Sequence, residues 1–503
     1  MKHLAKALLI CLVAFAPLLA QTPEDIAREA GIGAEEIVDT SPRAQLWADI
    51  VAARRAENLS LYETLTAQYN QQYPNAFSRV ASTADEPYAV LPGLSNGNGT
   101  SNDWGPGDVP VSTANILSPL IAGNAKSLRL RVDSLGNKFV AYIASNRDTL
   151  CVFRSTDQGL TWTRILNVLP GGTTKWHSFD FFVTDSVNNH LLGFAAVRTL
   201  AAAGYGGQLY WLSCLENGSG FRAAGIATRP AGRGHINPAI VSDGYMWSAS
   251  LTYWYTAFQN VDSTTGVGNQ ALAAFSTDWG TTWALDTARN SFNDFDLDID
   301  YNFRSDTIGV LLTNDITATN PNLRLQRIPL SGLGTGSTWT QLNVGATADP
   351  EFGGSFVSNR QSNALMIMYT RTQAGIDNIG YGISPTGAWA LANWTLNEIL
   401  QLQANNQNRA DLDCQEAQGA FRVAYVSKGP SRDTIIYTSA FTPPFAGHQI
   451  VNENRNASTS TAPSVAGFRS TAGFGGGVIY SELGPTGVFY DGSNINTDVR
   501  PTN

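Results

Sequence analysis

A sevenfold repetition of one short pattern constrains the fold of this chain more than any other feature. Two short apolar strands joined by a turn recur in segments that begin near residues 127, 178, 236, 294, 353, 410 and 463. The intervals are 51, 58, 58, 59, 57 and 53 residues, and each fits four short strands with their turns. Because one such unit cannot bury its faces alone, the repetition predicts an all-β, seven-bladed β-propeller over residues 116–493.

The last repeat is short, which leaves the ring one strand short of closure. We expect the missing strand to come from the start of the propeller, around Ile116–Ile121. A six-bladed propeller is the alternative count. The polar, turn-rich residues 494–503 read as a C-terminal tail.

The chain before the repeats divides into three parts. Residues 1–20 have a basic start and the apolar run ALLICLVAFAPLLA, which is typical of a signal peptide and predicts a secreted or cell-surface protein. Residues 21–80 contain apolar positions at helical spacing after a Ser41 cap and Pro42, so we expect a small helical segment. Residues 81–115 are rich in Gly, Asn and Pro and predict a linker.

Composition excludes some partners. The sequence has 32 Lys and Arg against 41 Asp and Glu, which argues against nucleic acid or an anionic membrane as the main partner. No segment beyond the leader approaches transmembrane length. Cys151, Cys214 and Cys414 are too few for a disulfide framework; a Cys151–Cys214 pair and buried thiols both remain open.

Two segments share the pattern Ser-x-Asp-x-Gly-x-Thr-Trp, at 153–163 and 275–284. An Asp side chain can accept hydrogen bonds from turn amides, Gly adopts positive φ, and Trp packs back between strands. The pattern therefore predicts two structural β-hairpin turns. The six residues that would form them are Asp157, Gly159, Trp162, Asp278, Gly280 and Trp283.

These two segments resemble Asp boxes, also called bacterial neuraminidase repeats, of the sialidase-like propeller superfamily. The resemblance implies that the turns lie between the third and fourth strands of a blade, away from the ligand-binding face. Catalytic sialidases carry Arg-Ile-Pro in an early blade, whereas this chain has it only at Arg327-Ile328-Pro329 in the fourth unit. The catalytic arginine is therefore not assigned to Arg327.

The run NDFDLDIDYN at 293–302 places four aspartates at alternate positions. In a strand, alternate side chains share one side, so we expect all four there, with Phe295, Leu297 and Ile299 packed on the neighbouring blade. A metal site, a pocket lining and a solvated strand face are all open. The run lacks the glycine and the twelfth-position Glu of an EF-hand loop, so we assign no metal ligand, and a divalent cation such as calcium shared between blades stays an alternative.

First strands of propeller blades line the central channel, and polar residues recur at their starts. Carboxylates suit hydroxyl binding and acid–base chemistry, so we predict as catalytic candidates Asp180, Asp296, Glu351 and Asp411. As ligand-binding candidates we predict Trp176, His177, Arg233, His235, Asp294 and Arg409. The sequence thus favours a glycan-binding propeller, with glycoside hydrolysis or polysaccharide cleavage as its chemistry if it is an enzyme. A non-catalytic adhesion or assembly propeller is the alternative.

Overall fold

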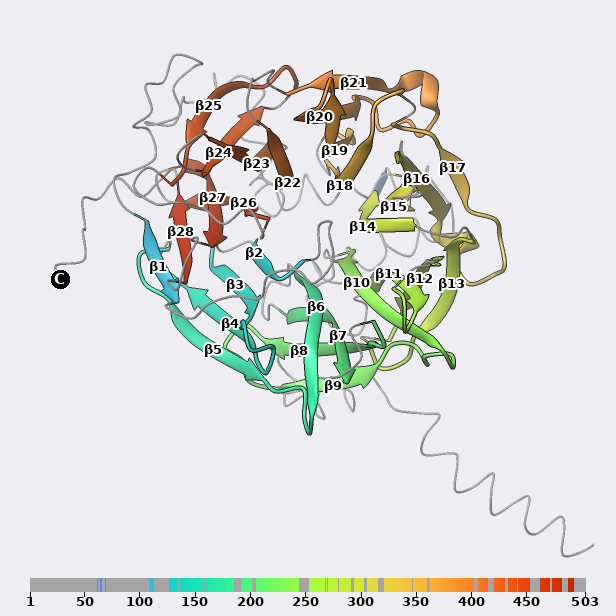
Figure 1. The fold of residues 1–503 in the computed structure, drawn as a ribbon, viewed down its shortest axis with the longest axis vertical. Helices are drawn as coiled ribbons and strands as arrows, with labels where there is room; N and C mark the ends of the chain where they lie inside the picture. The colour runs from blue at the N-terminus through green and yellow to red at the C-terminus, as the bar shows by residue number, and fades with distance from the viewer. Residues whose placement is uncertain are drawn as a thin grey trace, which may run out of the picture.

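The computed structural model describes residues 108–492 with gaps, and before them Leu61, Thr64, Leu65 and Gln68, which are helical. Seven four-stranded antiparallel sheets are arranged around a centre, as the view down the ring shows (Figure 1). The seven-bladed prediction is therefore confirmed, and the six-bladed alternative is wrong. The predicted signal peptide, most of the helical segment and the tail lie outside the described residues.

Each blade runs outward from the centre in chain order. Blade 1 contains β2 (Leu128–Val132), β3 (Lys138–Ile143), β4 (Leu150–Ser155) and β5 (Thr163–Val168). Blade 2 contains β6 (Thr174–Val183), β7 (Leu191–Leu200), β8 (Gln208–Leu215) and β9 (Arg222–Gly225). Blade 3 contains β10 (Arg233–Ser242), β11 (Trp254–Asp262), β12 (Gln270–Ser276) and β13 (Ala284–Arg289). Blade 4 contains β14 (Asp294–Asn302), β15 (Thr307–Asn314), β16 (Asn322–Pro329) and β17 (Thr340–Leu342).

The remaining blades follow the same order. Blade 5 contains β18 (Glu351–Ser358), β19 (Leu365–Gln373), β20 (Ile376–Ser384) and β21 (Thr395–Ile399). Blade 6 contains β22 (Gln407–Cys414), β23 (Phe421–Lys428), β24 (Asp433–Ala440) and β25 (Ala446–Ile450). Blade 7 combines β26 (Ser464–Ser470), β27 (Gly473–Ser481) and β28 (Val488–Gly492) with β1 (Val109–Ser112) from the start of the ring. Two 3-10 turns, Leu330–Gly332 and Leu391–Asn393, lie in blades 4 and 5.

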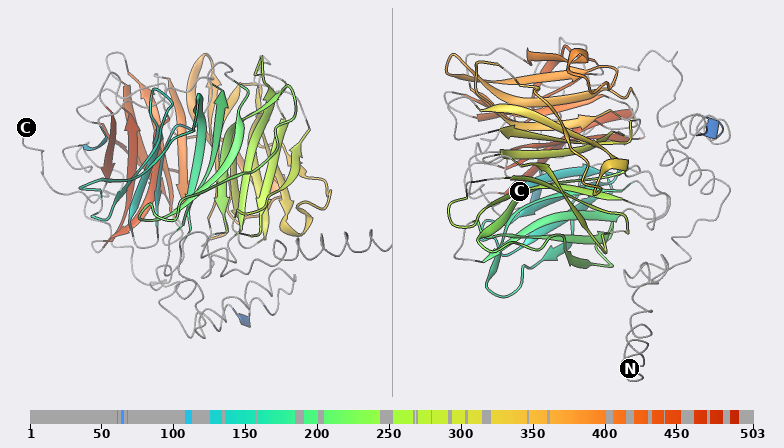
Figure 2. Two further views of the ribbon diagram at one scale, coloured as in Figure 1. Left: turned by 90° about the horizontal axis from the view of Figure 1, so that it is seen from below. Right: turned by 90° about the vertical axis from the view of Figure 1, so that its right-hand side faces the viewer.

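The hydrophobic core lies between the blades. Seven buried clusters occupy the seven interfaces, one between each pair of neighbouring sheets. The cluster between blades 2 and 3, for example, packs Trp211 against Trp254. Seen edge-on, the sheets stack side by side around the ring, so each covers the face of the next (Figure 2). This packing explains why the repeat is needed for stability: a lone blade would leave both apolar faces in water.

Strand β1 closes the ring by pairing with β28, as Val109 with Tyr490 and Pro110 with Phe489. The expectation that the first part of the propeller lends a strand is confirmed. Its expected position at 116–121 is wrong, because the strand lies earlier, where Val111 is buried in the core between blades 7 and 1. Pro110 fits this place because an edge strand tolerates a residue without an N–H.

The two Ser-x-Asp-x-Gly turns join the third and fourth strands of blades 1 and 3. In the first, Asp157 Oδ1 accepts hydrogen bonds from Ser155 Oγ at 2.7 Å and from the Thr161 amide at 2.9 Å. The Trp162 indole donates to the Gly159 carbonyl at 3.0 Å. The turn of blade 3 repeats the same bonds, through Asp278, Gly280 and Trp283. The predicted structural turns thus form as expected.

Five consecutive innermost strands carry a β-bulge in their N-terminal half. The register shifts fall at Trp176/Ser178, Ile236/Ala239, Phe295/Asp298, Phe352/Ser355 and Asn408/Asp411. At two of these bulges the backbone is left-handed, with φ of 47° at Asn237 and 50° at Asp296. A bulge re-aims the side chains that follow it, and such bulges often lie beside functional sites.

The bulge in β14 splits the aspartate run, so the expectation that all four carboxylates share one side is wrong. Asp294, before the bulge, pairs with Arg289 at the end of β13 in blade 3. Asp298 and Asp300, after it, accept hydrogen bonds from blade 5, from the amides of Phe356 and Ser358. The extra residue in the bulged strand reverses the alternation, and this explains the two directions.

Candidate functional site

The N-terminal ends of the innermost strands lie on one face of the ring, which we call the mouth. Successive strands of a blade are antiparallel, so the turns between third and fourth strands lie on the opposite face. The Asp157 and Asp278 turns are therefore far from the mouth. The predicted catalytic and ligand-binding residues all belong to first strands. Asp180 and Asp411 lie past the midpoint of their strands, and the other candidates lie in the N-terminal half.

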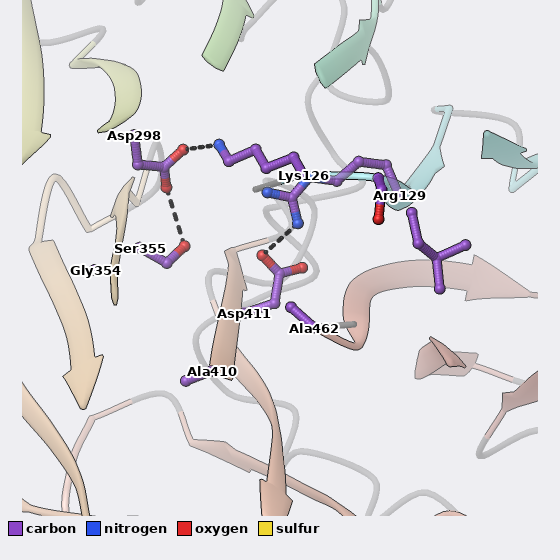
Figure 3. A pocket seen from close by; sticks show the side chains of 10 residues that line it. Lys126, Arg129, Asp298, Gly354, Ser355, Ala410, Asp411 and Ala462 are labelled. Carbon is purple, nitrogen blue, oxygen red and sulfur yellow. Dashed lines mark hydrogen bonds and ion pairs between the residues drawn. The ribbon is translucent and has the colours of Figure 1, made fainter. Parts of the chain in front are cut away.

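A hollow lies at the centre of the mouth (Figure 3). Blades 1, 4, 5, 6 and the segment before β26 contribute its lining, which consists of Lys126, Ser127, Leu128, Arg129, Asp298, Gly354, Ser355, Ala410, Asp411 and Ala462. Its inner part has room for roughly one water molecule. The charged lining is balanced, with two cations and two carboxylates.

Two cations of blade 1 cross-link the ring through this hollow. Lys126 Nζ contacts Asp298 of blade 4 at 2.5 Å and Asp180 of blade 2 at 3.3 Å. Arg129 contacts Asp180 at 3.0 Å and Asp411 of blade 6 at 3.2 Å. In Figure 3 the Lys126 side chain points to Asp298 and the Arg129 guanidinium to Asp411. Four blades thus meet in one buried network of ion pairs.

Asp180 is the centre of this network. It lies 3.5 Å from Arg131 in addition to Lys126 and Arg129, and it accepts a hydrogen bond from the Ile240 amide of blade 3 at 3.2 Å. Burial alone would raise its pKa, but the three cations outweigh burial and lower the pKa to about 2. A carboxylate that stays ionised at neutral pH and has these partners is well suited to hold blades together and poorly suited to donate a proton.

Asp411 is similarly engaged. Its Oδ2 accepts hydrogen bonds at 2.9 Å from the Ser464 hydroxyl and from the Val465 amide, both at the start of β26. Asp298 has the same relation to the next blade, accepting from Ser355 Oγ at 3.0 Å and from the Phe356 amide at 2.8 Å. These carboxylates fasten each first strand to the first strand of the following blade. They also form acceptors on the wall of the hollow.

Glu351 differs from the other carboxylates. It is fully buried at the start of β18 and accepts a hydrogen bond from Thr347 Oγ1 at 2.8 Å. Burial raises its pKa, against the opposing effects of Thr347 and Arg371. Asp296, the remaining catalytic candidate, is buried at the left-handed bulge position of β14. A raised pKa, as at Glu351, is what a general acid requires.

Both mouth histidines are buried and neutral. His177 bonds through Nδ1 to Ser178 Oγ at 3.0 Å, and burial, aided by Arg147, lowers its pKa to about 3. His235 packs its ring on Phe258, and burial, aided by Arg229, lowers its pKa to about 4. Among the described residues, His177 Nε2 and His235 Nδ1 have no hydrogen-bond partner.

The other ligand-binding candidates have varied positions. Trp176 is buried in the core between blades 1 and 2, with its indole N–H donated to the Val168 carbonyl at 2.8 Å. Arg233 donates to the carbonyls of Asn260 and Gly268 in its own blade. Arg409 belongs to the bulge of β22, and its side chain lies outside the described part of the chain.

Sequence reasoning missed the cations that organise the mouth. Lys126, Arg129 and Arg131 lie at the start of the first repeat, in the stretch KSLRLR. Two arginines at alternate positions of an innermost strand are the signal that could have revealed them, because such a strand points them along the channel wall. Cys151 and Cys214 are buried thiols without a disulfide, which settles the alternatives left open for them.

Two negative observations concern the described residues alone. Within them, no group of three His, Cys, Asp or Glu side chains is arranged to hold a metal ion. Among these residues there is also no helix with the length and apolar character needed to cross a membrane.

Comparisons with known proteins give structural likeness only. No protein-family model matches the sequence, and no curated protein matches it either. The fold is similar to an α-L-arabinanase of Penicillium chrysogenum (TM-score 0.38, 10% identity, 77% of this chain and 98% of that one). It is also similar to a protein of unknown function from Dyadobacter fermentans (0.43, 13%, 66% and 99%) and to a Trypanosoma rangeli sialidase (0.42, 11%, 66% and 57%). Similarities of this size carry no information on ligand or activity.

Proposed function

We propose that this chain is an exported propeller that binds a neutral carbohydrate at its mouth. The observation that carries the proposal is the central hollow, where Lys126, Arg129, Asp298, Ser355 and Asp411 meet. Cations supply hydrogen-bond donors and carboxylates supply acceptors, and a sugar hydroxyl needs both. The balanced charge disfavours a ligand with net charge, and the small inner space suits one hydroxyl or hydroxymethyl group of a ring bound above it. Export follows from the leader-like residues 1–20.

Within this proposal the two Ser-x-Asp-x-Gly turns are Asp boxes with a structural role. Their hydrogen bonds hold the turn itself, and their glycines and tryptophans pack on an aromatic ring of the preceding blade, Tyr490 and Trp211. They lie on the face opposite the mouth. This division leaves the mouth to ligand binding and assigns blade-to-blade packing to the turns.

The test is a glycan-array screen with the full chain and two valine variants. Ser355→Val fills the hollow with a methyl group and removes a hydroxyl, while Asp298 keeps Lys126 and the Phe356 amide. Ser439→Val, on β24 in the outer half of blade 6, is the matched control. We expect wild type and the control to bind the same neutral glycans and Ser355→Val to bind them at least tenfold more weakly. Failure of wild type to bind any glycan would overturn the proposal in favour of an adhesion or assembly module.

Glycoside hydrolysis is a second candidate function, favoured by the raised pKa of buried Glu351. A protonated carboxyl can donate to a leaving-group oxygen, and Asp296 of the adjacent first strand is the candidate second carboxylate. Product analysis on any bound glycan tests it. We expect wild type and the control Glu216→Gln, on the opposite face, to release sugar. We expect Glu351→Gln to release none. Intact glycan with every protein would make the chain a binder only.

A further inference from the structure

A buried hydrogen-bond chain crosses from blade 2 to blade 4 at the mouth. It begins at His177 Nδ1 and passes to Ser178 Oγ at 3.0 Å, which accepts from the Asn237 amide of blade 3, also at 3.0 Å. The Asn237 side-chain amide donates to Gln259 Oε1 at 2.7 Å, and Gln259 Nε2 donates to the Asp294 carbonyl at 2.6 Å. This hydrogen-bond chain runs through blades 2, 3 and 4. Blades 2 and 3 contribute no residue to the lining of the central hollow.

The hydrogen-bond chain fixes the proton on His177. Ser178 Oγ already accepts the Asn237 N–H, and its own proton has no other acceptor than His177 Nδ1 among the described residues. Ser178 therefore donates to Nδ1, so the neutral ring carries its proton on Nε2. His177 thus offers an N–H donor that no described group accepts.

Asn237 offers the complementary atom. Its side-chain NH2 is used by Gln259, which leaves Oδ1 as an acceptor, and within the described residues no group donates to it. Both side chains are more than nine-tenths buried, at 4% and 6% exposure. Asn237 is also held at φ 47°, a left-handed conformation that costs energy in most residues and concentrates at functional sites. Ser178 Oγ contacts both residues, through His177 Nδ1 and the backbone N–H of Asn237.

We propose that His177 Nε2–H and Asn237 Oδ1 form a subsite for one hydroxyl group of the carbohydrate. The inference rests on the proposed function and deepens it. A hydroxyl accepts from the imidazole N–H and donates to the amide oxygen, and it is small enough to enter a buried place. A cationic or anionic group would leave one of the two atoms unpaired.

The first test needs no ligand. Long-range ¹H–¹⁵N spectra of the full chain with labelled histidine report the tautomer of each neutral ring, and His177→Phe identifies the His177 signals. We expect the Nε2–H form across pH 6–8. A protonated Nδ1 would overturn the inference, because Nε2 would then be an acceptor beside another acceptor.

The second test measures binding of methyl glycosides of neutral hexoses and pentoses, each with its monodeoxy analogues. We expect His177→Phe, and Asn237→Gly, which keeps the left-handed backbone, to bind the parent glycoside about tenfold more weakly. For one deoxy analogue, wild type and both variants should bind equally. His448→Phe, at a half-buried histidine of β25, is the control that keeps full affinity.

The outcomes separate the two proposals. If wild type binds no glycoside or array glycan, the proposed function is wrong and the subsite falls with it. If wild type binds and both variants have the same affinity as wild type for every analogue, the carbohydrate site stands and the subsite is wrong. His177 Nε2 and Asn237 Oδ1 would then bind only an ordered water molecule. Circular dichroism melts of the two variants identify any loss caused by unfolding, and the tautomer measurement then decides.

Discussion

Single residues at the mouth differ in how much of their hydrogen-bonding capacity the protein itself uses. Asp180 is surrounded by three cations and a backbone amide. His177 and His235 have one satisfied or packed side and one ring nitrogen without a partner among the described residues. The hydrogen-bonding capacity of Asp180 is used within the protein. The two histidines are held neutral, because burying a charged ring there would be costly.

The buried histidines predict a loss of stability in mild acid. In the unfolded chain a histidine has a pKa near 6.5, whereas in the folded protein His177 and His235 have pKa values of about 3 and 4. Between the folded and unfolded pKa values the unfolded state binds more protons than the folded state. The two histidines therefore cost no stability above pH 6.5, and the free energy of unfolding falls as the pH drops below it. At pH 5 each histidine should cost about 2 kcal/mol.

Urea unfolding at pH 7 and pH 5 measures this loss. From pH 7 to pH 5 we expect the free energy of unfolding of His235→Phe to fall by about 2 kcal/mol less than that of wild type. The introduced phenyl ring can still pack on Phe258. Between pH 7 and pH 8 the difference in stability between the two proteins should stay constant, because His235 is neutral in both the folded and the unfolded state there. An equal loss in both proteins from pH 7 to pH 5 would contradict the burial of a neutral His235.

At the scale of elements, the turn of blade 1 shows how one glycine sets the distance between blades. Gly159 has φ 101°, and a Cβ there would overlap the Tyr490 ring of blade 7. Trp162 packs on the same ring, with centroids 5.3 Å apart. The turn therefore acts as a contact between blades as well as a connection within one.

This contact predicts an unequal effect of two alanine substitutions. Gly171 has φ 80° and open space where a Cβ would lie, so Gly171→Ala isolates the cost of the left-handed backbone, about 1 kcal/mol. Gly159→Ala adds overpacking against Tyr490 and should cost about 2 kcal/mol more than Gly171→Ala. Chemical unfolding of the two variants gives the comparison. Equal losses would show that Tyr490 moves aside freely.

The element scale also shows what a sequence can predict. The strands that begin near 178, 236 and 294 were found from alternation and turn residues, because these are local properties. The direction of Asp298 was missed, because the bulge before it depends on pairing with β15. Lys126 and Arg129 were missed because their partners Asp298 and Asp411 are 172 and 282 residues away, and nothing local marks such a pair.

At the scale of the whole molecule, the Asp180 network connects blades that share no interface. Blade 1 reaches blade 4 through Lys126 and blade 6 through Arg129. We expect Asp180→Asn to lower the free energy of unfolding by about 3–5 kcal/mol, because buried Lys126 and Arg129 and half-buried Arg131 lose their shared counter-charge. Asp148→Asn, which removes a half-exposed pair with Lys175, should cost less than about 1 kcal/mol.

Calorimetric melts of Asp180→Asn and Asp148→Asn at pH 7 measure the two costs. The contrast tests whether the network at the mouth holds the ring together. Similar losses in the two variants would show that the hollow is wet and its ion pairs are screened.

The pairing of β1 with β28 also sets an order in time. The ribosome releases Val109 early and its partner Tyr490 only near the end of the described chain. Until then, blades 1 to 6 can form from neighbouring segments, while β1 has no strand to pair with and the loop to be closed is the whole ring. Blade 7 can therefore be completed only after all the other strands exist, and a chain that stops before Val488 leaves an open arc with an unpaired edge at its start.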